Sequence, residues 1–385
     1  MNNITISANF DAGNISVIDS SDPNDIQLAI QPDNASDFFQ WFYFRLEGEV
    51  GQRCQIRILN AGQSSFADGW NNYQVCTSYN RQDWFRTPTE YQDGELCFEL
   101  TLSQNRVEFA YFIPYSEQRH LDLIARAQMH PCVTHSTLGP SLDGRAISLL
   151  RVTASDKPKH KVWITARQHP GETMAEWFME GLIDSLLDRN NATAWQLLQH
   201  SAFYLVPNIN PDGSVRGNLR TNAAGINLNR EWQSPSMEKS PEVFLVREKM
   251  LAEGGDVFLD IHGDEVIPYN FVAGCEGNPG YNERHQRMEE TFKAAYKQAS
   301  PDFQDQYGYP KPKPGQGNMT VAANWLGEQF KTLSFTIEMP FKDNDDLPNT
   351  ETGWSAQRSA QLGRDVLGPI KVVLGLVDCN PPYTT

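Results

Sequence analysis

Apolar and polar residues alternate with a period of two in short segments through the first third of the chain. The clearest examples are 54–58 and 96–102, and each predicts a half-buried strand because successive side chains of a strand point to opposite faces. The alternation resumes at 107–112 after a short polar connection, which predicts a hairpin. Aromatic residues crowd 38–44, where one run would serve both faces of a buried strand. We therefore expect an antiparallel β-sandwich domain over residues 1–115.

The pattern changes near residue 116, where Ser116 is placed to cap a helix that carries Leu121, Ile124 and Ala125. Beyond it, apolar runs typical of buried strands alternate with helical periodicity. The runs are 162–166, 203–206, 257–261 and 333–337, and the helical segments lie near 173–188, 240–253, 281–299 and 354–375. Such alternation places helices against a mostly parallel or mixed sheet. We expect residues 116–385 to form an α/β domain whose mixed sheet is flanked by helices.

Composition narrows the classes of function. The 385 residues include 48 Asp and Glu against 32 Lys and Arg, a net charge of −16, whereas a general nucleic-acid binder needs surplus cations to neutralise phosphates. The first residues show no basic region followed by an apolar one, so we expect no export signal, and no segment approaches the roughly 18–20 apolar residues that cross a bilayer. Six cysteines without paired spacing favour free thiols. We expect a cytoplasmic protein that binds neither nucleic acid nor membranes, and a homo-oligomer is left open.

Two histidines and one glutamate follow predicted strands of the α/β part. His169 and Glu172 form His-Pro-Gly-Glu after 162–166, and His262 closes 257–261. Functional side chains gather at the carboxyl ends of strands in such sheets, and two nitrogens with one oxygen are the donor set of catalytic zinc sites. Each residue alone also has a structural interpretation. The histidines could be loop residues whose hydrogen bonds are all made, and the glutamate could stabilise a helix N-terminus through the helix dipole. Together they predict one bound zinc ion.

Other charged residues stand close to these motifs. Glu338 ends the run 333–337 and could accept a proton from water beside the metal, although pairing with an arginine is the simpler interpretation for it alone. An Asn-Pro-Asp-Gly segment typical of a turn precedes Arg216 and Arg220. A guanidinium in a metal site could grip a carboxylate or stabilise an oxyanion.

In combination the motifs resemble the zinc metallocarboxypeptidases of the carboxypeptidase A type. His-Pro-Gly-Glu, Asn-Pro-Asp-Gly, Asn-Arg-x-Trp, Asp-Ile-His and Thr-Ile-Glu follow one another in that family's order. Gln-Trp-Phe-Tyr-Phe-Arg at 40–45, with the His-Pro-Gly-Glu form of the metal motif, is most similar to the cytosolic carboxypeptidase subfamily. The resemblance implies a β-sandwich domain ahead of a carboxypeptidase-like catalytic domain.

The resemblance also implies roles for individual residues. It makes His169, Glu172 and His262 the zinc ligands, Glu338 the general base, Arg220 the group that polarises the scissile carbonyl, and Asn229 with Arg230 the binders of the substrate's terminal carboxylate. Arg216 is a rival for the role of Arg220. Asn227 stands where classical members have an Asp that orients a ligand histidine, and Tyr307 and Tyr309 are candidates for the tyrosine that caps the substrate.

The sequence therefore predicts a zinc carboxypeptidase that removes the last residue of a peptide or protein. Release of glutamate is expected from the subfamily and from cations near the motifs, which are Arg167, Arg216, Arg220, Arg230, Lys311 and Lys313. An alternative is an N-acyl amino acid deacylase of the aspartoacylase type, which has a similar zinc site. From another class, a non-catalytic binding protein could use zinc only to brace its loops while the β-sandwich recognises a partner, but such a site normally has four protein ligands and no base.

Overall fold

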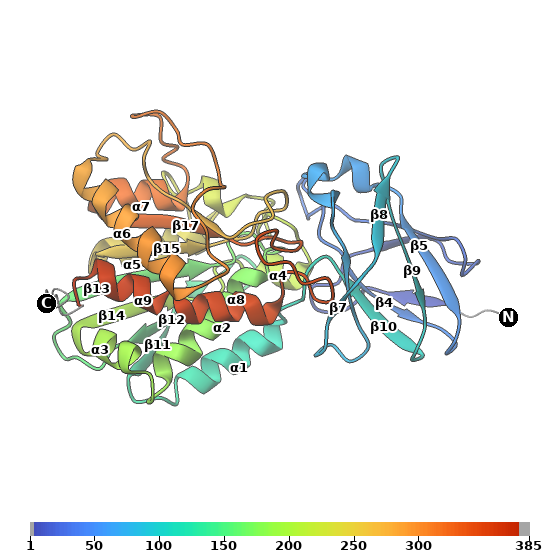
Figure 1. The fold of residues 1–385 in the computed structure, drawn as a ribbon, viewed down its shortest axis with the longest axis horizontal. Coiled ribbons are helices and arrows are strands. Elements are labelled where there is room, and N and C mark those ends of the chain that lie inside the picture. Colours follow the sequence, from blue (N-terminus) through green and yellow to red (C-terminus); the bar gives the residue numbers. More distant parts are fainter. Residues whose placement is uncertain (1–3, 377–385) are drawn as a thin grey trace, which may run out of the picture.

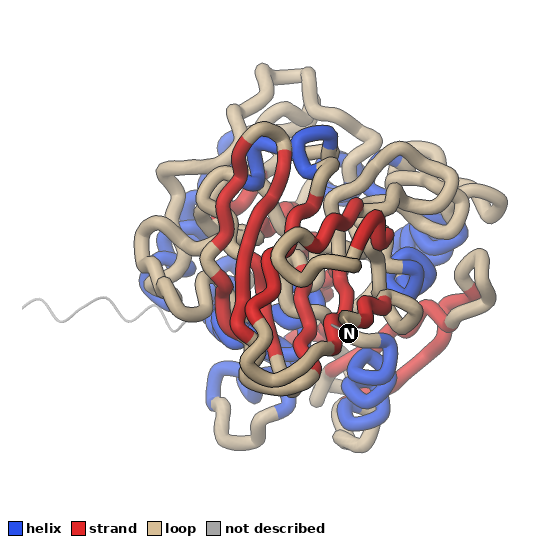
Figure 2. The backbone as a smooth tube through the Cα atoms, turned by 90° about the vertical axis from the view of Figure 1, so that its right-hand side faces the viewer, coloured by secondary structure: helices blue, strands red, loops and turns tan. Residues whose placement is uncertain are grey.

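A computed structural model describes residues 4–376, which form two parts that lie side by side (Figure 1). The N-terminal sandwich consists of two five-stranded sheets. In spatial order, one holds β1 (Thr5–Ser7), β4 (Tyr43–Glu47), β10 (Arg106–Ala110), β6 (Val75–Ser78) and β7 (Phe85–Thr87), and the other holds β2 (Ser16–Asp19), β3 (Ile26–Ala29), β5 (Arg53–Ile58), β9 (Glu95–Thr101) and β8 (Thr89–Gln92). All neighbours pair antiparallel except β3 and β5. The expected sandwich is confirmed, and its strands face the viewer in Figure 2.

The predicted hairpin between 96–102 and 107–112 is wrong. β9 pairs with β5 and β8, whereas β10 pairs with β4 and β6 in the opposite sheet. The connection therefore crosses from one sheet to the other, which a short polar segment permits as readily as a tight turn. The aromatic run also differs from the expectation, because regular pairing in β4 begins only at Tyr43 and Phe38 lies in the loop before it.

The second part is built on a seven-stranded mixed sheet, as predicted. Its order is β11 (Val133–Pro140), β12 (Ala146–Val152), β14 (Ser201–Val206), β13 (His160–Ala166), β15 (Val257–Ile261), β17 (Leu333–Glu338) and β16 (Phe271–Ala273). The four strands β14, β13, β15 and β17 run parallel at the centre, where their side chains are almost all buried because helices cover both faces.

The helices divide between the two faces of this sheet (Figure 1). One apolar core includes residues of α1 (Glu117–Ala127), α2 (Met174–Leu187), α3 (Ala192–His200), α6 (Glu283–Ala299), α8 (Ala356–Asp365) and α9 (Leu367–Val373). The other core includes residues of α5 (Pro241–Glu253) and α7 (Ala322–Phe330). Ser116 caps α1 through the N–H of Arg119, as expected.

Three helical features differ from the expectations. The single helix predicted over 354–375 is two, α8 and α9, because the ring of Pro369 clashes with a continuing helix and provides no N–H. The turn expected at Asn-Pro-Asp-Gly begins α4 (Pro211–Arg216), in which Asn210 accepts from the N–H of Gly213 and Pro211 occupies the first turn. Helices α3 and α7 were not predicted.

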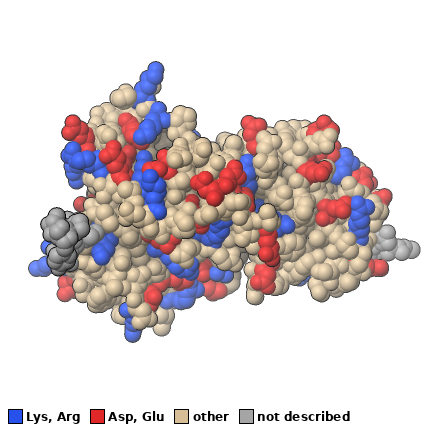
Figure 3. All heavy atoms as spheres, in the orientation of Figure 1, with Lys and Arg blue, Asp and Glu red and all other residues tan. Residues whose placement is uncertain are grey.

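The surface shown in Figure 3 carries acidic and basic side chains interspersed rather than one continuous basic face. Of the helices within residues 4–376, none is both long and apolar enough to cross a membrane. The cysteines that the structure describes, Cys54, Cys76, Cys97, Cys132 and Cys275, are free, and Cys379 lies outside the described residues.

Candidate active site

The predicted metal ligands and Glu338 lie at the carboxyl ends of three neighbouring parallel strands. His169 and Glu172 follow β13, His262 follows β15, and Glu338 is the last residue of β17. Because β15 pairs with both β13 and β17, these side chains reach one region although up to 169 positions separate them along the chain (338 − 169). All four side chains are buried.

The donor atoms of His169, Glu172 and His262 converge, all within 4.8 Å of one another. The Nδ1 atom of His169 lies 2.6 Å from Oε1 of Glu172, and Nδ1 of His262 lies 2.7 Å from Oε2 of the same carboxylate. The opposite ring edges are also held: Nε2 of His169 lies 3.1 Å from Oδ1 of Asn227, and Nε2 of His262 lies 2.8 Å from Oδ2 of Asp260. Such outer contacts fix the rings of metal-binding histidines.

Burial and the neighbouring charged groups set the protonation of each member of the triad. Burial, with the guanidinium of Arg220 nearby, lowers the pKa of His169 to about 4, so that its ring is neutral at physiological pH. Burial disfavours the charge of Glu172, yet the two rings outweigh this effect and hold its pKa below the usual range. Burial also opposes the charge of His262, but Asp260 and Glu172 together raise its pKa well above the usual value. The set of two nitrogens and one oxygen fits zinc.

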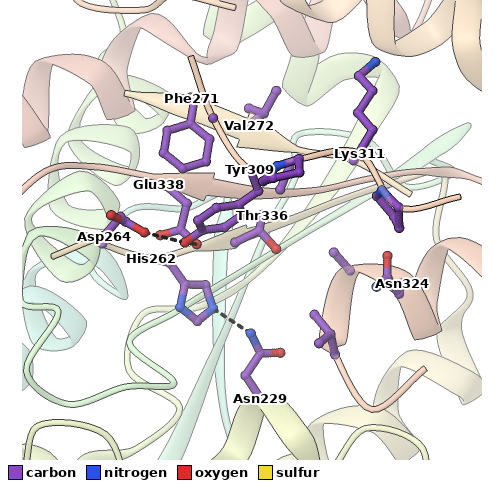
Figure 4. A pocket seen from close by; sticks show the side chains of 18 of the residues that line it. Asn229, His262, Asp264, Phe271, Val272, Tyr309, Lys311, Asn324, Thr336 and Glu338 are labelled. Carbon is purple, nitrogen blue, oxygen red and sulfur yellow. Dashed lines mark hydrogen bonds between the residues drawn. The ribbon is translucent and has the colours of Figure 1, made fainter. Parts of the chain in front are cut away.

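Glu338 lies near His262, with Tyr309 and Asp264 beside it (Figure 4). Its Oε1 accepts from the hydroxyl of Tyr309 at 3.2 Å, and the same hydroxyl lies 2.7 Å from Oδ2 of Asp264. Its Oε2 is buried and has no hydrogen-bond partner among residues 4–376. Burial raises the pKa of Glu338 well above its usual range, against the opposing charge of His262. A carboxylate in this setting has one oxygen available for a proton.

The remaining predicted residues fall into two groups. Arg220, Asn229 and Arg230 line the same cavity as the triad, which has a volume of about 760 Å³. Asn229 is fixed because its Oδ1 accepts from the N–H of Ala322 at 2.9 Å. Arg216 does not line this cavity; at the end of α4, its guanidinium binds Asp143 at 2.9 Å.

The cations expected near the site also divide into those that line the cavity and those that do not. Lys311 lines the cavity and lies 3.0 Å from Glu276, whereas Lys313 is not part of the lining. Arg167 is buried and paired with Glu176 at 2.7 Å, so it cannot meet a substrate. A cation that the sequence did not single out, Lys293, lines the cavity as well.

Sequence reasoning singled out Asn227, which contacts His169, but it missed other partners that orient the site. Asp260 precedes His262 by two positions, and side chains two apart on a strand share a face, so this contact had a signal in the sequence. Tyr309 was one of two candidate tyrosines, and its loop gave no means to choose. Nothing in the sequence indicates the contacts that the N-terminal sandwich makes with the second part of the protein.

The chain matches two family models. Residues 6–112 match the cytosolic carboxypeptidase N-terminal domain, and residues 120–354 match zinc carboxypeptidase. A curated relative, human cytosolic carboxypeptidase 1, is 28% identical over 325 residues, which cover 71% of this chain and 26% of that protein. Cytosolic carboxypeptidase 6 of Caenorhabditis elegans is 25% identical and is aligned over 88% of this chain and 79% of its own length.

Solved structures give a similar result. A metallo-carboxypeptidase from Pseudomonas aeruginosa, in complex with (2-guanidinoethylmercapto)succinic acid, is 49% identical, covers 96% of this chain and 99% of its own, and superimposes with a TM-score of 0.95. A metallo-carboxypeptidase from Burkholderia cenocepacia is 46% identical, with 97% and 100% coverage and a TM-score of 0.95. Neither the deacylase nor the non-catalytic alternative is favoured by these similarities.

Proposed function

Because this chain belongs to the zinc carboxypeptidase family and is a metallocarboxypeptidase, we propose that it uses one zinc ion to hydrolyse the last peptide bond of peptides or proteins. The observation that carries this proposal is the convergence of the triad, Glu338 and two arginines in one cavity. The ion would be held by His169, Glu172 and His262. When bound, zinc acidifies a water molecule and polarises a carbonyl oxygen.

Each of the other residues has a separate task in the proposed reaction. Glu338 takes the proton of the attacking water on its free Oε2 and gives it to the leaving amine. Arg220 donates to the oxygen that becomes negative as the carbonyl carbon turns tetrahedral. Asn229 and Arg230 bind the free terminal carboxylate, which sets the cleaved bond one residue from the end of the chain. The hydroxyl of Tyr309 steadies the other oxygen of Glu338. We leave Arg216 outside the proposed site because it is bound to Asp143.

Amidation of the substrate's terminal carboxylate should lower kcat/KM by about 10–150-fold. Arg230 would then face a neutral amide and lose a charge-assisted contact of about 1.5–3 kcal/mol. The measurement compares kcat/KM for one peptide in its free and amidated forms, with released amino acids identified by mass spectrometry. Equal rates on both forms would contradict an exopeptidase that measures its distance from the chain end.

We further propose that glutamate is the preferred terminal residue. Glu276 is neutralised by Lys311 at 3.0 Å, whereas Lys293 lies 3.9 Å from Glu276 and 4.0 Å from Glu289, beyond hydrogen-bonding distance. Burial, followed by the charge of Glu276, raises the pKa of Glu289 and so weakens its competition for Lys293. Lys293 therefore has donors to offer a substrate carboxylate. Salt screens distant surface acids, with a Debye length of about 8 Å at physiological ionic strength, more than it screens these neighbours.

Peptides that differ only in a terminal Glu, Leu, Lys or Arg test this preference. We expect kcat/KM to be about 10–100-fold higher for Glu than for Lys, which corresponds to one charge-assisted hydrogen bond. Lys293→Met should remove most of that difference, and Lys249→Met on α5, which pairs with Glu253, is the matched control. The guanidino group in the ligand of the Pseudomonas relative makes Arg the informative competitor. A preference for Arg or Lys would assign the specificity to Glu276 instead.

We also propose a division into an N-terminal domain of residues 1–115 and a catalytic domain of residues 116–385, and a cytoplasmic location. The division is supported by the end of β10 at Ala110 and the start of α1 at Glu117. The location is supported by the names of the cytosolic relatives.

A further inference from the structure

The segment that presents Arg220 is held by a single aspartate of the N-terminal sandwich. Asp33 is 3% exposed, and its carboxylate accepts from the backbone N–H groups of Leu219 at 2.5 Å, Arg220 at 2.8 Å and Thr221 at 2.9 Å. The hydroxyl of Thr221 adds a fourth contact at 3.0 Å. These residues lie up to 188 positions apart in the sequence. Three consecutive amides aimed at one carboxylate fix the path of the backbone at Arg220.

The side chain of Arg220 is held by the same part of the molecule. Its guanidinium carbon lies 5.6 Å from the ring centroid of Phe38 and 5.2 Å from that of Phe66, distances typical of cation–π contacts. Within residues 4–376 the guanidinium forms no ion pair, although Arg216 four positions earlier is paired with Asp143. Two aromatic faces therefore orient the charge without neutralising it, which leaves its hydrogen-bond donors for a ligand.

A second set of contacts supports the start of this segment. Gly217 ends α4 with φ of 71°, a conformation that favours glycine, and an added Cβ would lie 2.8 Å from the carbonyl oxygen of Ala12. Asn14 donates to the carbonyl oxygen of Gly217 at 2.9 Å. On the other side, the carbonyl of Leu219 accepts from the N–H of Gly171, inside the His-Pro-Gly-Glu motif, at 2.9 Å. The segment is thus clamped between the N-terminal sandwich and the metal-binding turn.

We propose that Asp33 is a positioning residue for the reaction: it acts across the boundary between the two parts of the protein, with Phe38 and Phe66, to aim the guanidinium of Arg220 at the reacting carbonyl. The inference rests on the proposed function of Arg220. It assigns the N-terminal sandwich a share in catalysis that its strands, none of which lines the cavity, do not suggest. An arginine loses much rotational freedom when it is fixed, so preorganisation of this kind lowers the cost of orienting it in the transition state.

Asp33→Asn tests the proposal, because the amide has the same shape but replaces one acceptor oxygen by a donor that faces backbone N–H groups. Misplacement of a catalytic group by about 1 Å can cost a hundredfold in rate, and we expect kcat to fall about 10–100-fold with KM little changed. The matched control is Asp11→Asn: Asp11 also belongs to the N-terminal part and accepts a backbone N–H across the boundary, from Glu117 of α1 at 2.7 Å. It should retain nearly the wild-type kcat.

Two further measurements separate positioning from a general loss of stability. In a double-mutant cycle with Arg220→Ala, the double variant should be about as slow as Arg220→Ala alone, because Asp33 has no effect once its target is gone. Hydrogen exchange at the amides of Leu219, Arg220 and Thr221 should accelerate in Asp33→Asn but not in Asp11→Asn, with zinc content unchanged in both. If Asp33→Asn does not fold, Phe66→Leu tests the orientation of Arg220 through the contact with the Phe66 ring. The loss in kcat caused by Phe66→Leu should also vanish in the Arg220→Ala background.

The outcomes distinguish this inference from the function on which it rests. Provided that the wild-type protein is active, wild-type turnover in Asp33→Asn would overturn the role of Asp33 alone. So would a double variant in which the losses of Asp33→Asn and Arg220→Ala add. Unchanged exchange at the three amides would overturn it too. A wild-type protein that releases no terminal amino acid from any peptide would overturn the proposed function, and this inference with it.

Discussion

Glu338→Gln should lower kcat by about 10²–10⁴-fold, the usual contribution of a general base, while zinc stays bound and the fold persists. The amide has nearly the shape of the carboxylate and can still accept from Tyr309 through its oxygen. It cannot take a proton from water, which is the task of the free Oε2. The measurement is kcat on a free-acid peptide, together with zinc content and melting temperature.

Two further variants identify the cause of the loss. Glu338→Asp keeps a carboxylate but withdraws it by one methylene, and we expect an activity between those of the wild type and the amide. Glu253→Gln removes a carboxylate that binds Lys249 at the end of α5, and it should behave as the wild type. A Glu338→Gln protein with undiminished kcat would mean that another group in the cavity accepts the proton, and Asp264, the other partner of Tyr309, would be the first to examine.

The convergence of His169, Glu172, His262 and Glu338 could be predicted because its information is local. Each of these residues ends a strand or follows it closely, and the apolar runs of β13, β15 and β17 identify those ends without knowledge of the fold. The mixed sheet then brings strand ends together by its topology alone. The same reasoning fails for the arginines, because Arg216 and Arg220 stand four positions apart in similar surroundings and only the packing directs one to Asp143 and the other into the cavity.

Contacts between distant segments account for most of what the sequence did not reveal. Nothing around Asp33 indicates that its carboxylate meets the backbone of 219–221, since the contact depends on how the sandwich docks on the α/β part. The strand connection at 103–105 is a comparable case: the alternation on either side is correct, but the choice between a hairpin and a crossing depends on pairing with β4 and β5. Hydrophobic periodicity and residue propensity describe single helices and strands, whereas the partners of each strand depend on the whole fold.

Removal of zinc should abolish turnover, and re-addition of one equivalent per chain should restore it. The triad supplies the only group of three converging His, Cys, Asp or Glu ligands within residues 4–376. His262→Ala leaves two ligands, so the zinc content of dialysed protein should fall below about a tenth of an equivalent, in line with the steep dependence of zinc affinity on a complete ligand set. His200→Ala, at the end of α3, is the matched control and should retain both zinc and activity.

The pH dependence of zinc loading gives this prediction a second, independent readout. Asp260 and Glu172 raise the pKa of His262 in the metal-free protein, so a zinc ion must displace a proton from that ring before it can bind. His169, with a pKa of about 4, requires no such exchange at physiological pH. Zinc affinity should therefore increase as the pH rises from 5 to 8, with release of about one proton per zinc bound, which calorimetry in buffers of different ionisation enthalpy measures. Loading without proton release would contradict the charged state of His262, and full peptidase activity after chelation would contradict the metal's part in the reaction altogether.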